Sequence, residues 1–153
     1  MSAEERLREL GIHLPPAPAP VASYVPVVVS GGLAYVSGQV PMSEGKLLWK
    51  GKLGAELDFV AGAEAARQCG LQALSVLRAE LGSLDRVRRI VKVSVFVASE
   101  RGFTDQPKVA NGASDLLVQV FGDLGRHARA AVGVAELPLS APVEVEIVAE
   151  VEA

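Results

Sequence analysis

The spacing of hydrophobic residues changes along the chain, and this pattern predicts both strands and helices. Runs rich in valine and aromatic residues at 24–29 and 33–40 predict two strands, and Ser-Gly-Gly at 30–32 supplies the turn between them. A third, weaker strand is expected over 46–52, after another turn signal. The first part of the domain is therefore expected to be mostly β-structure.

Two helices are predicted where apolar residues recur every three or four positions. The longer one begins after Asp58, a residue suited to an N-cap, and ends near Gly82. Because the first half of its apolar stripe is small, we expect this helix to lie close against a sheet; the stripe consists of Ala63, Ala66, Gly70, Leu74, Leu77 and Leu81. The opposite side is expected to face solvent and consists of Glu64, Gln68, Gln72 and Ser75. The second helix is predicted over 110–122.

Further strands complete the pattern. Alternating valines predict a strand over 86–98, and two more strands are expected over 128–135 and 143–151. The element order is therefore ββ(β)αβαββ. Two helices on one face of a mixed β-sheet form an α+β layer rather than a doubly wound fold, and α+β is the class that we predict.

The first residues of the chain differ in character from the rest. Residues 3–10 predict a short helix closed by Gly11, and the proline-rich sequence at 15–20 predicts an extended arm. We therefore expect an N-terminal helix and arm over 1–22, followed by a single domain over 23–153 that is long enough to bury a core.

Composition limits the partners that we expect. Hydrophobic residues make up 50% of the chain and charged residues 22%, which is typical of a globular protein, and the formal net charge of −3 argues against a broad surface for nucleic acid. No apolar run approaches the ~18 residues needed to cross a bilayer, and no signal peptide is evident, so we expect no membrane contact and a cytoplasmic location. The single Cys69 cannot form an internal disulfide and is expected to be a small buried residue.

Several kinds of functional site lack their sequence signatures. One cysteine with His13 and His127 gives no metal-ligand spacing, so we expect no metal site. The chain has neither a G-x-S-x-G motif nor a glycine-rich phosphate loop, so a serine hydrolase and a nucleotide-binding enzyme are unsupported. A basic cluster is the best evidence for RNA binding, but it lacks aromatic residues that stack on bases, and we interpret it as a solvated strand edge. It consists of Arg86, Arg88, Arg89 and Lys92.

Arg129 stands near the head of the small and apolar residues that predict the strand over 128–135. If this strand is packed on both faces, the guanidinium points inward and needs an anion, and a planar carboxylate matches its donors best. If Arg129 only opens the strand, it points into water. Glu144 and Glu146 begin the last strand on the side opposite its valines, and one of them would orient a water beside such a carboxylate.

Three segments together resemble the RidA/YjgF family: Tyr24 with YVSGQVP at 35–41, ARAAVGVAELP at 128–138, and VEVE at 143–146. The resemblance covers nearly the whole domain. It implies a chorismate-mutase-like subunit that forms a homotrimer with ligand pockets between subunits. It also implies an enamine/imine deaminase, similar to 2-iminobutanoate/2-iminopropanoate deaminase, which hydrolyses 2-aminoacrylate-type intermediates to 2-keto acids and ammonia without a cofactor.

The resemblance also places the family's site residues on this sequence. Arg129 matches the arginine that binds the substrate carboxylate, and Glu144 matches the acidic residue near the hydrolytic water and the imine nitrogen. Tyr24 and Ser37 match the tyrosine and serine of the substrate pocket, and Asn111 matches its asparagine. A carboxylate held by Arg129 would fix the imine for attack by water. Because Glu144 would then lie near Arg129, we expect its pKa to fall.

The sequence departs from the family pattern around Arg129. His127 replaces a proline, and Ala130 and Ala131 replace residues with a hydroxyl or thiol group, so any role of those groups is absent. His127 either lines the substrate pocket as a proton carrier or lies partly exposed at the strand entrance. Two alternatives to the deaminase stay open: a non-catalytic trimeric module that binds small carboxylates, and an endoribonuclease or translation inhibitor.

Overall fold

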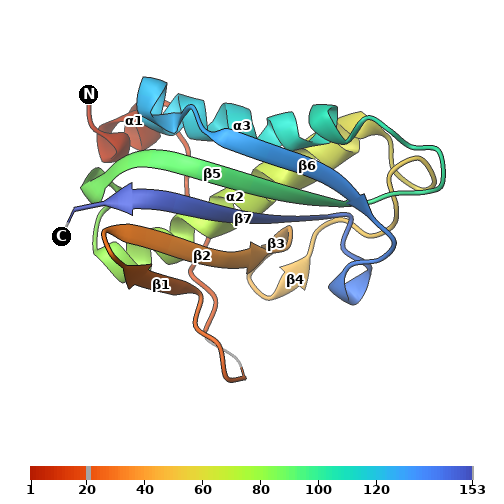
Figure 1. Cartoon of the computed structure of the whole chain (residues 1–153), viewed down its shortest axis with the longest axis horizontal. Coiled ribbons are helices and arrows are strands. Elements are labelled where there is room, and N and C mark those ends of the chain that lie inside the picture. Colours follow the sequence, from red (N-terminus) through yellow and green to blue (C-terminus); the bar gives the residue numbers. More distant parts are fainter. Residues whose placement is uncertain (20–21, 153) are drawn as a thin grey trace.

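Within residues 1–19 and 22–152, which the computed structural model describes, a five-stranded sheet carries two long helices on one face (Figure 1). The sheet consists of β1 (Val27–Ser30), β2 (Leu33–Gln39), β5 (Val87–Ala98), β6 (Ala128–Val134) and β7 (Val143–Val151). The helices are α1 (Ala3–Glu9), α2 (Phe59–Leu81) and α3 (Gln106–Phe121). The shorter elements are β3 (Met42–Ser43), β4 (Lys46–Leu47) and 3-10 turns at Leu84–Arg86, Gly122–Gly125 and Pro138–Ser140.

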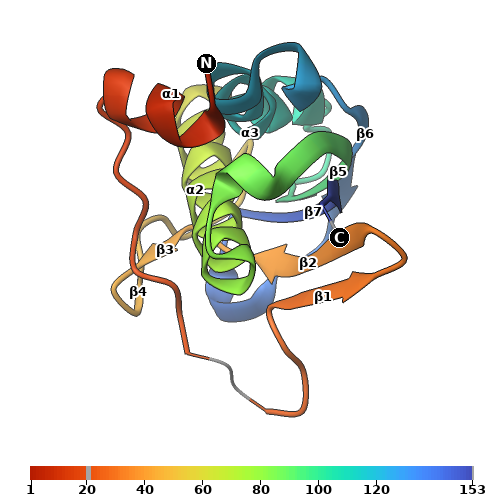
Figure 2. The same cartoon turned by 90° about the vertical axis from the view of Figure 1, so that its left-hand side faces the viewer.

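The strands follow the order β1-β2-β7-β5-β6 across the sheet. Neighbouring strands are antiparallel except β5 and β6, which are parallel and are connected through α3. This arrangement agrees with the rule that parallel strands need a long crossover connection, usually a helix. Figure 2 shows α2 and α3 on the same side of the sheet. The predicted α+β class, with two helices on one face of a mixed sheet, is confirmed.

Local signals end α2 where the sequence predicts. The side chain of Asp58 accepts a hydrogen bond from the backbone N–H of Ala61 at 2.9 Å and so caps the N-terminus. Gly82 ends the helix in the left-handed conformation with φ of 85°, which a glycine adopts without steric cost. Both predicted ends are confirmed.

The side of α2 that was expected to face solvent is partly buried. Glu64 is exposed, but Gln72 and Ser75 are only 5% and 6% exposed. The hydroxyl of Ser75 donates to the carbonyl oxygen of Pro15, so the segment after α1 lies against this part of the helix. The expectation was wrong for these two residues because the spacing within one helix contains no information about a segment that covers it from elsewhere.

The glycine of the predicted stripe packs against α3 rather than the sheet. A β-carbon on Gly70 would lie 2.9 Å from Cδ2 of Leu116, and one on Gly112 of α3 would overlap the carbonyl oxygen of Ala63. Small residues thus allow α2 and α3 to approach each other closely. The predicted close approach exists, but its nearest partner is a helix.

Several other boundaries differ from the predicted ones. β1 starts at Val27, so Tyr24 precedes the strand, and the short β3–β4 hairpin outside the main sheet replaces the strand expected over 46–52. α3 begins at Gln106, four residues before the predicted start. Pro107 allows this because proline fits the first helical turn, where its missing N–H has no partner to lose.

The basic cluster does not lie on a strand edge, because β5 is in the interior of the sheet between β7 and β6. Arg86 donates to the carbonyl oxygens of Leu81 and Glu152, and Arg89 donates to that of Arg126. Two of the four basic side chains therefore bind carbonyl groups of this chain, which reduces the number that point freely to a partner.

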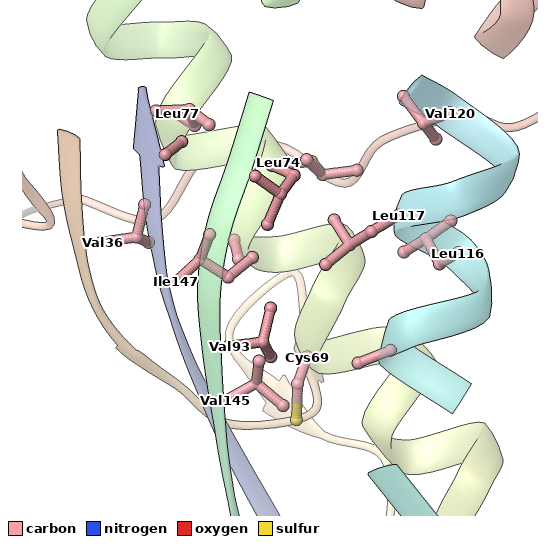
Figure 3. Close-up of a cluster of buried hydrophobic side chains, with 14 of the residues drawn as sticks. Val36, Cys69, Leu74, Leu77, Val93, Leu116, Leu117, Val120, Val145 and Ile147 are labelled. Atoms are coloured by element: carbon pink, nitrogen blue, oxygen red, sulfur yellow. The ribbon is translucent and has the colours of Figure 1, made fainter. Parts of the chain in front are cut away.

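The hydrophobic core lies between the sheet and the helices (Figure 3). Val145 of β7 and Leu74 of α2 are fully buried there, and Leu7 of α1 belongs to the same cluster. Cys69 is also fully buried, with Sγ 3.5 Å from the carbonyl oxygen of Val143, and burial raises the pKa of its thiol well above the ordinary value. The prediction of a small buried residue at this position is confirmed.

Candidate functional site

Arg129 reaches from β6 to α3. It pairs across β6 and β5 with Val93, whose side chain is buried against the helices, so the arginine side chain leaves the same face of the sheet. Nη1 donates to Oδ1 of Asn111 at 2.8 Å and to Oγ of Ser114 at 3.1 Å. The structure thus brings Arg129 and Asn111, both expected at the site, into direct contact.

The hydrogen bonds continue from Ser114 to His127. Oγ of Ser114 lies 2.9 Å from Nε2 of His127, and Nδ1 of that ring lies 2.6 Å from the carbonyl oxygen of Gly125. A carbonyl oxygen only accepts, so the neutral ring carries its proton on Nδ1 and accepts the Ser114 hydroxyl at Nε2. Burial lowers the pKa of His127, and the charge of Arg129 adds to this effect, while the bond to Gly125 opposes it. The ring is therefore neutral around pH 7.

The guanidinium of Arg129 has donors to spare. Both hydrogen bonds use Nη1 and go to neutral groups, and the ion pairs found among residues 1–19 and 22–152 do not involve Arg129. Its side chain is exposed and borders a shallow hollow shared with Ser114 and His127. Nε and Nη2 are therefore free to bind a planar carboxylate.

Within the single chain, the strand that carries Arg129 is not packed on both faces. β6 is an edge strand with one neighbour, and most of its residues are exposed. A run of small apolar residues predicts burial, but it does not specify whether the covering surface belongs to the same chain.

Glu144 lies on the opposite face of the sheet from Arg129. It alternates along β7 with Val143 and Val145, which are buried against the helices, so its carboxyl group points to the other side. There it packs on Gly38: a β-carbon at that position would lie 2.8 Å from Cδ of Glu144. Only glycine leaves room for the carboxyl group in this position.

The pKa of Glu144 is raised, which contradicts the expected fall. Partial burial is the main cause, and the charge of Glu146 adds to it. Arg129 was expected to lower this pKa, but it lies on the other face of the sheet. A carboxyl group with a raised pKa exchanges protons more readily near neutral pH than an ordinary glutamate does.

Tyr24 and Ser37 both lie close to Gly38. The hydroxyl of Ser37 donates to the carbonyl oxygen of Val25 at 2.8 Å, and so holds the segment that carries Tyr24. Tyr24 is 56% exposed and, with Gly38, lines a hollow of about 270 Å³. Ser37 therefore holds the segment before β1 in place, while the side chain of Tyr24 stays exposed.

Arg129 and Glu144 do not meet within one chain. In the sheet register, Glu144 lies opposite Phe96 of β5, and Phe96 lies opposite Val132 of β6, three residues beyond Arg129. Two strand spacings and three residue rises separate their Cα atoms by roughly 14 Å. Because the two side chains also point to opposite faces, the candidate site residues form two separate groups, which we call half-sites. One holds Arg129, Asn111, Ser114 and His127. The other holds Glu144 against Gly38, with Ser37 beside Gly38 in β2 and Tyr24 lining the same hollow as Gly38.

Sequence reasoning missed Ser114. The signal was its spacing from Asn111, since residues three apart lie on the same face of a helix. The sequence also showed no hydroxyl directly after Arg129, yet Ser114 supplies one from α3.

Residues 1–19 and 22–152 contain neither a cluster of metal ligands nor a membrane-spanning helix. No group of three or more His, Cys, Asp or Glu side chains is arranged there to hold a metal ion. No helix in these residues is long and apolar enough to cross a membrane.

Comparisons with known proteins place this geometry in a family. Residues 4–151 match the family model described as "YjgF/chorismate mutase-like, putative endoribonuclease". Protein TCP17 of Trypanosoma cruzi is 53% identical over 145 residues, covering 94% of this chain and 91% of that protein. The 2-iminobutanoate/2-iminopropanoate deaminase of Dermatophagoides farinae is 30% identical over 142 residues, covering 92% of this chain and 95% of that protein.

A solved structure agrees with the sequence comparisons. The crystal structure of a protein of unknown function from Agrobacterium tumefaciens superposes with a TM-score of 0.90 and 45% identity, covering 99% of this chain and 94% of that one. The family model and these relatives span nearly all of the chain, including both half-sites. The chain therefore belongs to the RidA/YjgF family of chorismate-mutase-like proteins.

Proposed function

We propose that this protein is a cofactor-free deaminase that hydrolyses the imines of small 2-amino acids to 2-keto acids and ammonia, and that it acts as a homotrimer. The observation that carries the proposal is the exposed guanidinium of Arg129, which neutral groups hold in place and which keeps Nε and Nη2 free. The deaminase name of the Dermatophagoides farinae relative supports the reaction type.

Arg129 binds the substrate carboxylate in this mechanism through two parallel hydrogen bonds from Nε and Nη2. The bound carboxylate fixes the plane of the adjacent imine, which removes much of the entropic cost of attack by water. Water adds to the imine carbon, and the resulting carbinolamine expels ammonia as its oxygen forms the new carbonyl. The balance is R–C(=NH₂⁺)–COO⁻ + H₂O → R–CO–COO⁻ + NH₄⁺, with no covalent bond to the protein.

Glu144 moves protons in this proposal. It accepts a proton from the attacking water and returns it to the departing nitrogen, which requires a carboxyl group that exchanges protons near neutral pH. Its raised pKa supports this role better than the lowered pKa expected from the sequence. Tyr24 contacts the ligand from the same half-site.

A second copy of the chain completes the site, because Arg129 and Glu144 of one chain point to opposite faces of the sheet. Within residues 1–19 and 22–152, no helix covers the face that carries Glu144, and this face exposes large apolar side chains, including Val28, Tyr35 and Val132 at 49%, 47% and 45%. Exposed apolar surface of this kind is typical of an interface between chains. Packing this face against a neighbouring subunit would bring Glu144 of one copy toward Arg129 of another.

A coupled assay tests the activity. A dehydratase generates 2-aminoacrylate in solution, and the release of pyruvate and ammonia is followed with and without the protein. We expect faster release with the wild type, and about a hundredfold lower kcat/KM for Arg129→Ala, since two charge-assisted hydrogen bonds are lost. The exposed Arg101→Ala serves as a charge-matched control and should behave as the wild type. Unchanged release with the wild type, or full activity of Arg129→Ala, would rule the proposal out.

A non-catalytic module that binds small carboxylates is the second candidate. The observation in its favour is that Ala130 and Ala131 follow Arg129, so β6 brings no hydroxyl or thiol to the site. Calorimetric binding of 2-oxobutanoate that disappears in Arg129→Ala, together with background rates of imine hydrolysis, would favour this module over the enzyme.

A further inference from the structure

We propose that Ser114 and His127 act as a pair that positions Arg129 for the substrate carboxylate. Neither residue touches the reacting atoms in this proposal, so both are positioning residues. The inference rests on the proposed function for its ligand, a small 2-imino or 2-keto acid.

The hydrogen bonds of this pair all run in one direction. Nη1 of Arg129 donates to Ser114, the Ser114 hydroxyl donates to Nε2 of His127, and Nδ1 of His127 donates to the carbonyl oxygen of Gly125. Each donor polarises the next group, so the bonds strengthen one another. The chain of bonds ends on a backbone atom and therefore ties the arginine rotamer to the main chain.

The neutral state of His127 is essential to this arrangement. Only the neutral ring has an acceptor at Nε2, and the lowered pKa of His127 keeps it neutral at pH 7. With this acceptor in place, the Ser114 hydroxyl turns toward the ring and presents its lone pairs to Arg129. Without it, the hydroxyl is free to rotate and Arg129 loses one of its two fixed partners.

Different atoms of the Arg129 guanidinium serve for positioning and for ligand binding. Asn111 and Ser114 both use Nη1, on the side toward α3, while Nε and Nη2 carry no hydrogen bond to residues 1–19 or 22–152. The pair thus holds one corner of the guanidinium and leaves the other edge for the ligand. Ser114 supplies from α3 a hydroxyl that β6 lacks after Arg129, where Ala130 and Ala131 stand.

Four variants test the pair. Ser114→Ala removes the shared hydroxyl, and His127→Phe removes the acceptor while keeping a flat ring. The conservative variants are Ser114→Thr, which keeps a hydroxyl, and His127→Gln, whose amide oxygen can accept near the position of Nε2. Thr104→Val, which removes an exposed hydroxyl, and His13→Phe are matched controls at exposed positions. Imine hydrolysis gives KM and kcat, and calorimetry gives the Kd for 2-oxobutanoate without any turnover.

We expect Ser114→Ala and His127→Phe each to raise KM and Kd about tenfold, with kcat within about twofold of the wild type, since the lost bond orients a charged group. The double variant Ser114→Ala/His127→Phe should be no worse than either single variant, because His127 acts through Ser114. Ser114→Thr and His127→Gln should recover most of the affinity, and the controls should match the wild type.

Two results would contradict the positioning role of Ser114 and His127: an unchanged Kd in either loss variant, or effects of the two variants that add in the double variant. The Kd measurements also separate this inference from the proposed function. If the wild type shows no imine hydrolysis but the predicted Kd pattern appears, the deaminase fails while the positioning pair stands. If hydrolysis occurs but Kd is insensitive to both variants, the pair fails and the deaminase stands. Should His127→Phe not fold, His127→Ala takes its place in the comparison with Ser114→Ala and in the double variant.

Discussion

Single residues in this protein acquire their chemistry from neighbours that are distant in the sequence. Arg129 is a free guanidinium held by Asn111 and Ser114, and Glu144 is a carboxyl group pressed against Gly38. Arg129 is held by neutral side chains, and Glu144 packs against a glycine, so neither charge is paired with an opposite one. This leaves the arginine charge unpaired for a ligand and keeps the glutamate unusually easy to protonate.

The raised pKa of Glu144 has a consequence for stability. Its folded pKa exceeds the ordinary value of 4.5, so the charged form is penalised in the fold and the folded state binds the proton more tightly than the unfolded state. The Glu144 contribution to the free energy of unfolding is therefore unfavourable above the folded pKa. This cost disappears as the pH falls below 4.5.

We accordingly expect Glu144→Gln to raise the melting temperature at pH 7 relative to the wild type. The difference should shrink as the pH is lowered below 4.5, where both states of the wild type are protonated. Thermal melts across this pH range, with the exposed Glu150→Gln as a control on the same strand, measure the effect. A Glu144→Gln variant less stable than the wild type at pH 7 would contradict the raised pKa.

At the scale of elements, the two helices depend on small residues at their contact. Gly112 of α3 faces the carbonyl oxygen of Ala63 on α2, while Gly70 of α2 faces the flexible end of Leu116. A helix normally gains stability when glycine is replaced by alanine, by about 1 kcal/mol. Because the helices approach closely here, we expect the same replacement to lower the free energy of unfolding instead.

The expected loss for Gly112→Ala is at least about 2 kcal/mol in the free energy of unfolding, since backbone must move to admit the methyl group. Gly70→Ala should cost less, because Leu116 can change its rotamer. Urea denaturation of the two variants under identical conditions provides the comparison. Equal stability of Gly112→Ala and the wild type would mean that the helices do not approach as closely as described.

The whole molecule consists of two layers, a sheet and the helices that cover one of its faces. Helices cover one face of the sheet, while the other face exposes Val28, Tyr35 and Val132 together with Glu144. Exposed apolar side chains on an uncovered sheet face favour burial against another surface. In the proposed homotrimer, a neighbouring subunit would cover the open face. The same packing would bring the Glu144 half-site of one subunit next to the Arg129 half-site of another.

The oligomeric state is therefore expected to control activity. Tyr35→Glu should place a charge on the open face, shift the protein from trimer to monomer in analytical ultracentrifugation, and lower imine hydrolysis at least tenfold although Arg129 and Glu144 are unchanged. Leu10→Glu, at an equally exposed apolar position after α1, is the control and should remain trimeric and active. A fully active monomer of Tyr35→Glu would show that one chain suffices.

Most helices and strands of this protein could be predicted from local sequence patterns. The caps at Asp58 and Gly82, the alternating valines of β5 and β7, and the burial of Cys69 follow from signals within a few residues, and the structure confirms them. The family could also be recognised from short segments, because they keep their order and composition. Such features can be predicted without knowing which distant segments pack against them.

Which residues contact one another could be seen only in the folded chain. Strand register and side-chain alternation place Arg129 and Glu144 on opposite faces, while the crossover through α3 brings Ser114 to the arginine. The burial of Gln72 and the raised pKa of Glu144 likewise depend on segments far away in the sequence. Periodicity describes one element at a time, whereas contacts and electrostatic environment are set by how elements pack, and that is why the half-sites became visible only in the fold.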